Sequence, residues 1–338
     1  MSIDLTKYDT RTDLILEEIK DSDGIVTDIL NPYSHTKITK VSILNDMYNK
    51  KKGEYYTIET MALESHDHDL LQELEGCVID CLKEILKKNN LFLKHKALVV
   101  GLGNSLVTPD ALGPSVLENI LVTRHLFLLE EPVSEGFRNV SSLTPGVMGQ
   151  TGMETKDIIL GVVKETKPDF ILAVDALASK SMDHLCKSIQ ITDAGINPGS
   201  GIGNNRSEMS FETLGIPVIA IGVPTVLDVV SIVSDSLEFI LKSFQQEMIG
   251  GNPLIVKSKE EKDYDDISLP SMEMREKVMG DIGLLDNNQK RMLLHEALGT
   301  NYNLFVCPKE IDVYLNDLRH LLAEAINTAL SPSYNRQK

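Results

Sequence analysis

The 338-residue sequence has no tryptophan, few aromatic residues and four cysteines. The cysteines (Cys77, Cys81, Cys186 and Cys307) form neither a C-x-x-C pair nor a zinc-finger spacing, which favours free thiols in a reducing compartment. No apolar run reaches the length of a membrane-spanning helix. Residues 1–8 lack the apolar core of a secretory signal. We therefore expect an intracellular, cytoplasmic protein.

Basic residues are also scarce. Lys and Arg number 33 against 50 Asp and Glu, which gives a formal net charge of −17. A field of that sign repels nucleic acids and anionic membranes and favours neutral or cationic partners. We therefore expect neither a direct nucleic-acid partner nor a membrane partner.

What the sequence does contain is a regular alternation of apolar strands and amphipathic helices after residue 97. Strands are expected at 97–101, 169–174 and 217–222, and helices at 109–122, 154–166 and 225–247. Near-continuous apolar strands alternating with helices predict an α/β fold. We expect a Rossmann-like (phosphorylase/hydrolase-like), doubly wound and mostly parallel sheet with helices on both faces.

The flanking segments predict additions to this core. Residues 36–63 alternate with period two and predict an N-terminal strand pair, followed by a helix over 66–88. Residues 286–298 and 309–330 predict a C-terminal helical extension. The charged segment 257–281 predicts a mobile insertion.

Two carboxylates follow apolar strands. Asp110 lies just after the glycine turn Gly101-Leu-Gly-Asn104, within the predicted start of a helix, and Asp175 directly follows the strand that begins at Phe170. Ligands and chemistry collect at the carboxyl ends of strands in open α/β sheets. A helix start keeps Asp110 ionised, whereas burial raises the pKa of an aspartate at the end of a buried strand. Such a pair suits acid/base chemistry.

Less specific interpretations stay open for both aspartates. Asp110 is also what the helix dipole favours in any first turn, and Asp175 is also a common loop-capping residue. Three glycine-rich loops, at 144–152, 194–204 and 222–225, are expected near the same edge. Their backbone N–H groups at Gly146, Gly149, Gly199 and Gly201 are candidate donors for an oxyanion or a substrate.

Other site types have weak support. The third glycine of a dinucleotide fingerprint falls on Leu106, and no phosphate-binding G-x-x-x-x-G-K-[ST] motif occurs. No His-Glu-x-x-His motif is present, and Ser200 lacks a nucleophile-elbow sequence. A non-hydrolytic nucleotide-binding module stays an alternative.

Several blocks of the chain together resemble the germination protease of endospore-forming bacteria. The blocks lie, in order, at 99–104, 107–114, 121–127, 145–149, 166–170, 174–178, 197–204 and 213–225. The resemblance implies an atypical aspartic endopeptidase, a hydrolase that needs no cofactor. Its catalytic aspartates correspond to Asp110 and Asp175. It also implies that the enzyme starts the degradation of small acid-soluble spore proteins during spore germination, in the forespore and spore core.

The resemblance further implies a homotetrameric zymogen that removes its own N-terminal segment by autoprocessing. Family substrates are cut after an acidic residue and before an apolar one, with a glutamate downstream. Asp13 and Leu14, followed by Glu17, fit that pattern. We therefore expect a propeptide at 1–13 and one protease domain at 14–338. Arg124, Arg138 and Lys180 are candidates to bind the acid before the cut.

The fold also resembles that of hydrogenase maturation proteases, which bind nickel through two acidic residues and a histidine. The acids would fall at Asp110 and Asp175, but the segment that would supply the histidine holds Asn197. An amide oxygen is a poor ligand for such a metal. We expect no metal site, and a metal-dependent maturation-type protease stays an alternative.

Overall fold

The computed structural model describes residues 12–18, 24–30, 33–46, 50–129, 132–199, 208–250, 267–298 and 304–334. Residues 1–11 of the predicted propeptide and 257–266 of the predicted insertion lie outside these residues, whereas 267–281 are described and include helix α9 (Met272–Met279). Within the described residues, no helix is long and apolar enough to cross a membrane.

The chain divides into two compact units. The larger comprises residues 11–179, 183–226 and 307–338, and the smaller comprises residues 1–10, 180–182 and 227–306. Both predicted carboxylates and the predicted cleavage site lie in the larger unit. The prediction of one protease domain over 14–338 stays a prediction.

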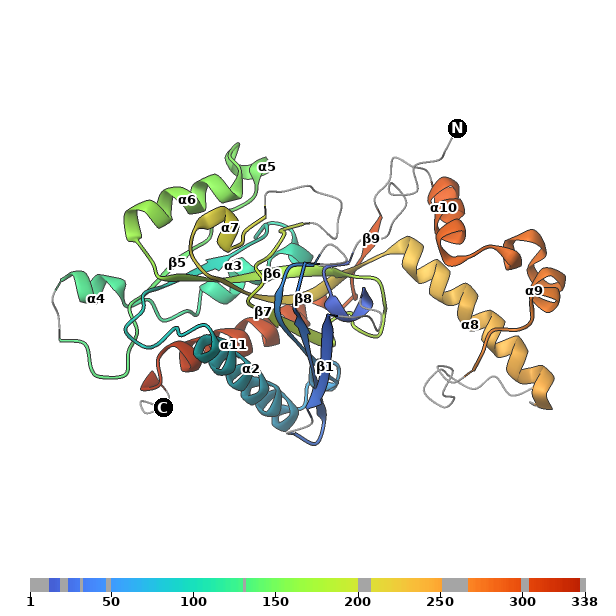
Figure 1. The fold of residues 1–338 in the computed structure, drawn as a ribbon, viewed down its shortest axis with the longest axis horizontal. Coiled ribbons are helices and arrows are strands. Elements are labelled where there is room, and N and C mark those ends of the chain that lie inside the picture. The colour runs from blue at the N-terminus through green and yellow to red at the C-terminus, as the bar shows by residue number, and fades with distance from the viewer. Residues whose placement is uncertain are drawn as a thin grey trace. The chain divides into compact units, whose positions relative to one another are not determined.

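The described residues form a nine-stranded sheet at the centre of the fold (Figure 1). Its strands are, in spatial order, β1 (Ile25–Leu30), β2 (Thr36–Ile43), β3 (Gly53–Thr60), β7 (Ser188–Thr192), β8 (Val218–Asp228), β6 (Phe170–Ser179), β4 (Ala97–Gly101) and β5 (Val140–Leu143). The short strand β9 (Phe305–Val306) pairs with the end of β8.

The sheet is parallel at one side and antiparallel at the other. β4 pairs in parallel with β5 and with β6, whereas β1, β2, β3, β7 and β8 pair antiparallel in succession. Helical crossovers between β4, β5 and β6 allow the parallel pairing, and short connections from β1 to β3 require the antiparallel one. The α/β fold is confirmed, but the sheet is mixed rather than mostly parallel.

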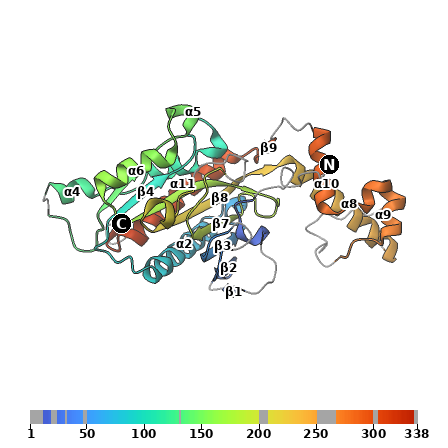
Figure 2. The ribbon, with the colours of Figure 1, turned by 45° about the horizontal axis from the view of Figure 1, so that its top comes forward.

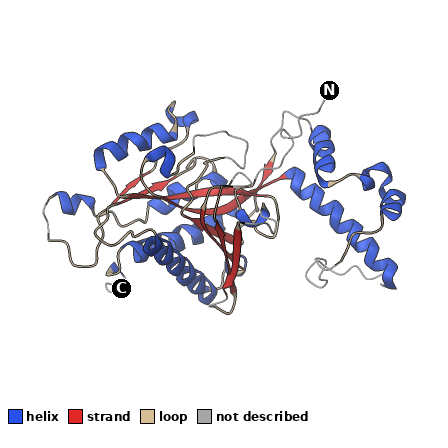
Figure 3. Ribbon diagram, in the orientation of Figure 1, coloured by secondary structure: helices blue, strands red, loops and turns tan. Residues whose placement is uncertain are grey.

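Helices cover both faces of the sheet (Figures 2 and 3). On one face, α2 (His68–Lys88), α3 (Leu112–Leu117) and α11 (Ile311–Leu330) pack with residues such as Leu172 and Ile189 into the larger core. On the other, α6 (Thr155–Thr166) and α7 (Phe211–Leu214) pack over Leu98 and Ile171. Alternate residues of β4 and of the first half of β6 therefore face different helices, which makes β4 and residues 170–174 apolar throughout.

The remaining helices are short or lie in the smaller unit. They are α1 (Ala62–Ser65), α4 (Arg124–Leu128), α5 (Met148–Thr151), α8 (Val229–Gly250) and α10 (Asn287–Leu298), with 3₁₀ turns η2 (Ile15–Glu17), η3 (Thr108–Asp110) and η5 (Gly280–Leu284). The helix predicted over 109–122 is thus broken into η3 and the short α3. Cys77, Cys81 and Cys186 are free and buried, and burial raises the pKa of each thiol to about 12. Cys307 is free and exposed.

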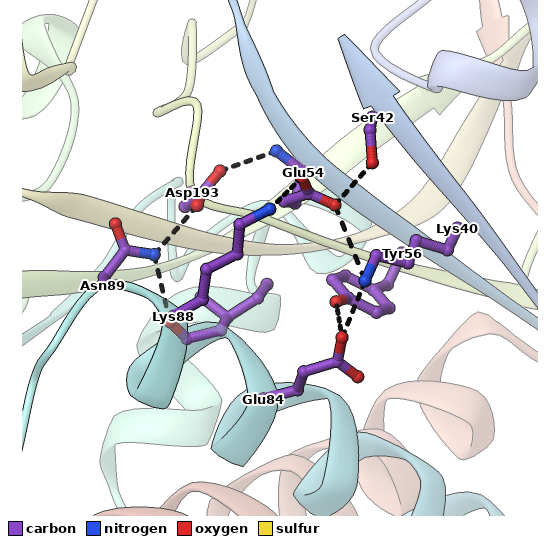
Figure 4. Close-up of polar contacts among 9 residues, drawn as sticks. Lys40, Ser42, Glu54, Tyr56, Glu84, Lys88, Asn89 and Asp193 are labelled. Carbon is purple, nitrogen blue, oxygen red and sulfur yellow. Dashed lines mark hydrogen bonds and ion pairs between the residues drawn. The ribbon is translucent and has the colours of Figure 1, made fainter. Parts of the chain in front are cut away.

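A polar cluster joins the antiparallel strands to α2 (Figure 4). Glu54 on β3, 7% exposed, accepts hydrogen bonds from Ser42 and Lys88. Glu84 on α2 accepts from Lys40, at 2.7 Å, and from Tyr56, at 2.6 Å. Burial alone would raise the pKa of Glu54, but the hydrogen bonds and the nearby lysine charges more than offset it and hold the pKa below its ordinary value.

This cluster makes stability depend on pH. Because the pKa of Glu54 is lower in the folded chain, the unfolded chain binds more protons between the two pKa values. The stabilisation is present above the unfolded pKa and is lost as the pH falls through the folded one. We expect Glu54→Gln to lower the unfolding free energy at pH 7 by about 2 kcal/mol. Urea unfolding at pH 7 and in acid measures both effects.

A matched control is Glu118→Gln. The Glu118 side chain is 69% exposed, and its ion pair with Arg319 is long at 3.9 Å and therefore weak. This variant should change stability by less than about 0.5 kcal/mol. The interpretation of Glu54 is wrong if its variant is as stable as this control at pH 7, or if the difference between them does not shrink in acid.

Candidate active site

The loop after β4 is built by close backbone contacts. A side chain at Gly113 would meet the backbone of Leu102 and Val174 at about 2.5 Å, and one at Gly103 would meet the Asp110 carbonyl oxygen at 2.0 Å. The Asn104 N–H donates to that same carbonyl oxygen at 3.0 Å. Only glycine permits this close packing, so the two glycines determine the position of the Asp110 backbone.

Asp175 lies inside a strand rather than after it. β6 continues to Ser179, and Asp175 is 3% exposed, with its Oδ1 accepting from the Ala176 N–H at 2.9 Å. Val174 packs into the α2–α11 core and Ala173 into the α6 core. Because side chains alternate along a strand, Asp175 lies on the α6 face.

The two predicted carboxylates belong to elements that contact each other. The Leu102 N–H donates to the Val174 carbonyl oxygen at 2.8 Å, and η3, which ends at Asp110, packs against β6. Thr225, at the far end of the apolar part of β8, donates from its hydroxyl to the Pro109 carbonyl oxygen at 2.7 Å. Three neighbouring segments of chain thus hold the Asp110 turn beside the strand that carries Asp175.

One of the predicted glycine loops lies at this edge. The Gln150 side chain donates to the Asn104 side chain at 2.6 Å, which ties residues 146–152 to the Asp110 loop. Gly146 has a φ of +70°, and Gly149 lies within α5. Gly199 is half-buried, and Gly201 lies outside the described residues. Their role as donors stays a prediction.

The predicted cleavage site docks onto β6. The Asp13 N–H donates to the Ala178 carbonyl oxygen at 3.2 Å, and the Ala178 N–H donates to the Asp13 carboxylate at 3.0 Å. Leu14 and Ile15 are fully buried, and Ile15 packs with Val41 and Tyr55 in a small cluster of its own. The residues on both sides of the predicted cut are therefore ordered, three residues along the strand from Asp175.

The side chains that hold this segment were not predicted from the sequence. Lys50 and Gln190 both contact the Asp13 main chain, and Ser179 donates to Glu17 at 2.6 Å. Gln190 lies in Ser188-Ile-Gln-Ile-Thr192, where polar and apolar residues alternate, and this alternation is a signal that could have predicted a strand with Gln190 on its polar face. Nothing in the sequence near Lys50 distinguishes it from the two lysines that follow it.

Arg138 is not available to bind an acidic side chain. It is 3% exposed, and its guanidinium donates to the backbone carbonyls of Leu91, Phe92, His95 and Leu330. Burial lowers its pKa to about 10. The prediction that it binds the acid before the cut is wrong, because its donors fasten α11 to the connection before β4.

The chain is similar to known proteins over nearly its whole length. A family model described as germination protease matches residues 6–338. The chain belongs to the germination protease family. Proteins named Germination protease from Bacillus cereus and Bacillus mycoides are each 44% identical to it, over 97% of this chain and 95% of theirs. The Bacillus anthracis protein of that name is 43% identical over the same shares.

Membership of the germination protease family makes this chain a peptidase and confirms the resemblance seen in its sequence blocks. The matched range includes Asp110, Asp175 and the docked segment 12–18. Among the described residues, no three His, Cys, Asp or Glu side chains are grouped as metal ligands. The catalytic role of Asp110 and Asp175 stays a prediction.

Proposed function

We propose that this germination protease is an aspartic-type endopeptidase that initiates the degradation of small acid-soluble spore proteins when a spore germinates. Asp110 and Asp175 are its catalytic pair. The chain is made as a zymogen and cuts itself between Asp13 and Leu14. It acts in the forespore and spore core, and the active assembly is a homotetramer.

One observation carries the proposal. The segment with the sequence Asp13-Leu-Ile-Leu-Glu17, acidic then apolar with a glutamate downstream, lies against the strand that bears Asp175. A chain segment that matches the substrate pattern is thus bound to the strand that carries a buried carboxylate, three residues along from it. This supports both the choice of Asp175 and the position of the cut.

The chemistry follows from two carboxyl groups in different protonation states. The ionised aspartate takes a proton from water, and the water oxygen attacks the Asp13 carbonyl carbon. The protonated aspartate then gives its proton to the leaving nitrogen of Leu14. At its helix-start position Asp110 suits the ionised role, and the more deeply buried Asp175 suits the protonated one.

Incubation of the full chain, alone and with a small acid-soluble spore protein, tests the function. We expect intact mass spectrometry to show loss of residues 1–13, and fragments of the spore protein to end at an acidic residue that precedes an apolar one. Unchanged mass together with an intact spore protein would show that the proposed function is wrong.

A further inference from the structure

The side-chain amide of Gln190 spans the predicted scissile bond. Its Nε2 donates to the Asp13 carbonyl oxygen at 3.1 Å, and its Oε1 accepts from the Ile15 N–H at 2.7 Å. Gln190 is 7% exposed and lies on β7 between Ile189 and Ile191, which face the α2–α11 core. Its side chain therefore lies on the same face of the sheet as Asp175.

Lys50 is a second donor to the same oxygen. Its Nζ lies 2.9 Å from the Asp13 carbonyl oxygen and 3.4 Å from that of Thr12. The Lys50 side chain is only 15% exposed, and its ammonium lies 3.6 Å from the Glu18 carboxylate. A partly buried cation on a carbonyl oxygen makes a charge-assisted hydrogen bond, which is stronger than a neutral one.

Two donors within about 3 Å of one carbonyl oxygen match the geometry of an oxyanion hole. The neighbouring positions are held as well, because the Ala178 N–H binds the Asp13 carboxylate and the Ser179 hydroxyl binds Glu17. Docking alone could be achieved by these last two contacts and by the buried Leu14. The shortest Lys50 contact and the Gln190 Nε2 contact both go to the one carbonyl group that peptide hydrolysis would attack.

We propose that Lys50 and Gln190 polarise the carbonyl group of the residue before the cleaved bond, in Asp13 and in a substrate segment bound in its place. The inference rests on the proposed function. When water adds to the Asp13 carbon, the carbon–oxygen π electrons move to the oxygen, and the two donors stabilise that charge. The electron pair on the oxygen then re-forms the C=O bond as the C–N bond breaks. The Leu14 nitrogen leaves with a proton from the protonated aspartate.

The test is the first-order rate at which the full chain loses residues 1–13, followed by intact mass. We expect Lys50→Met and Gln190→Leu each to slow it about 100-fold, since removing one oxyanion donor has an effect of that size. Lys50→Arg keeps a cationic donor and should recover most of the rate. Lys52→Met, an exposed lysine two positions away, is the matched control and should leave it unchanged.

A second measurement separates polarisation from docking. In an Asp175→Asn background, which should stop the cut, amide hydrogen exchange of residues 12–17 reports whether the segment stays bound. Slow cutting with protection kept supports the inference. Slow cutting with protection lost counts against it, because lost docking then explains the rate. Unchanged or faster cutting in Lys50→Met and Gln190→Leu also overturns it.

The outcomes also distinguish this inference from the proposed function. If the unaltered chain never loses residues 1–13, self-processing fails, and the role of Lys50 and Gln190 fails with it. If the unaltered chain is cut and both variants are cut equally fast, only the role of these two residues is wrong.

Discussion

Asp110→Asn and Asp175→Asn are each expected to slow self-processing and spore-protein digestion by about 10³-fold, the middle of the range for losing a general acid or base. Asparagine has nearly the shape of aspartate but can neither take a proton from water nor give one to an amine. Because Asp175 is buried within β6, a carboxylate dissolved in the buffer cannot reach its position and take over its proton transfer. The rates of propeptide release and of peptide cleavage measure the loss.

The double variant provides a sharper test. If the two aspartates act as one unit, Asp110→Asn with Asp175→Asn should be no slower than either single variant, because the second loss removes nothing that still functions. Asp157→Asn, at an exposed position on α6, is the control and should leave the rate unchanged. A single variant that retains near-normal activity would show that its aspartate is not catalytic.

Gly103→Ala should be the most damaging small substitution in the site. Gly103 has a φ of +109°, and an added Cβ would lie 2.0 Å from the Asp110 carbonyl oxygen and 3.1 Å from its Oδ1. The loop must move, and Asp110 must move with it. We expect at least a 100-fold loss of cleavage rate, roughly the effect of an ångström of misplacement, and about 2 kcal/mol of backbone strain.

Gly161→Ala, on α6, is the matched control, because a Cβ there meets nothing within 4 Å and its φ lies outside the left-handed region. It should leave both stability and cleavage rate nearly unchanged. Equal loss of activity in Gly103→Ala and Gly161→Ala would mean that the clash at Asp110 is not the cause. Thermal unfolding of both variants checks that each is folded.

Strong periodicity explains which elements could be predicted. The helix expected at 66–88 forms over 68–88, and the helix expected at 154–166 forms over 155–166, because both carry a clear apolar stripe. The strands β1, β5 and β7 were missed, since none of them has the continuous apolar run that marks β4. β6 was expected to end before Asp175 because aspartate is uncommon inside strands and common in turns. The strand instead continues through Ala176-Leu-Ala to Ser179.

The site shows the same division. Asp110 and Asp175 could be nominated because each follows an apolar strand, a local pattern. Lys50 and Gln190 contact Asp13 across 37 and 177 positions of sequence, and no local pattern encodes such a contact. The antiparallel order that places β7 beside β8, and hence Gln190 under the N-terminal segment, had to come from the structure.

The complete burial of Leu14 has a consequence for the products of a cut at its nitrogen. Hydrolysis there would replace one neutral amide with a new ammonium and a new carboxylate in a place with little water. The new Asp13 carboxylate would lie beside the Lys50 ammonium, which would keep it bound. A new ammonium at the buried Leu14 is costly to desolvate, so this end of the cut chain would gain by moving into solvent.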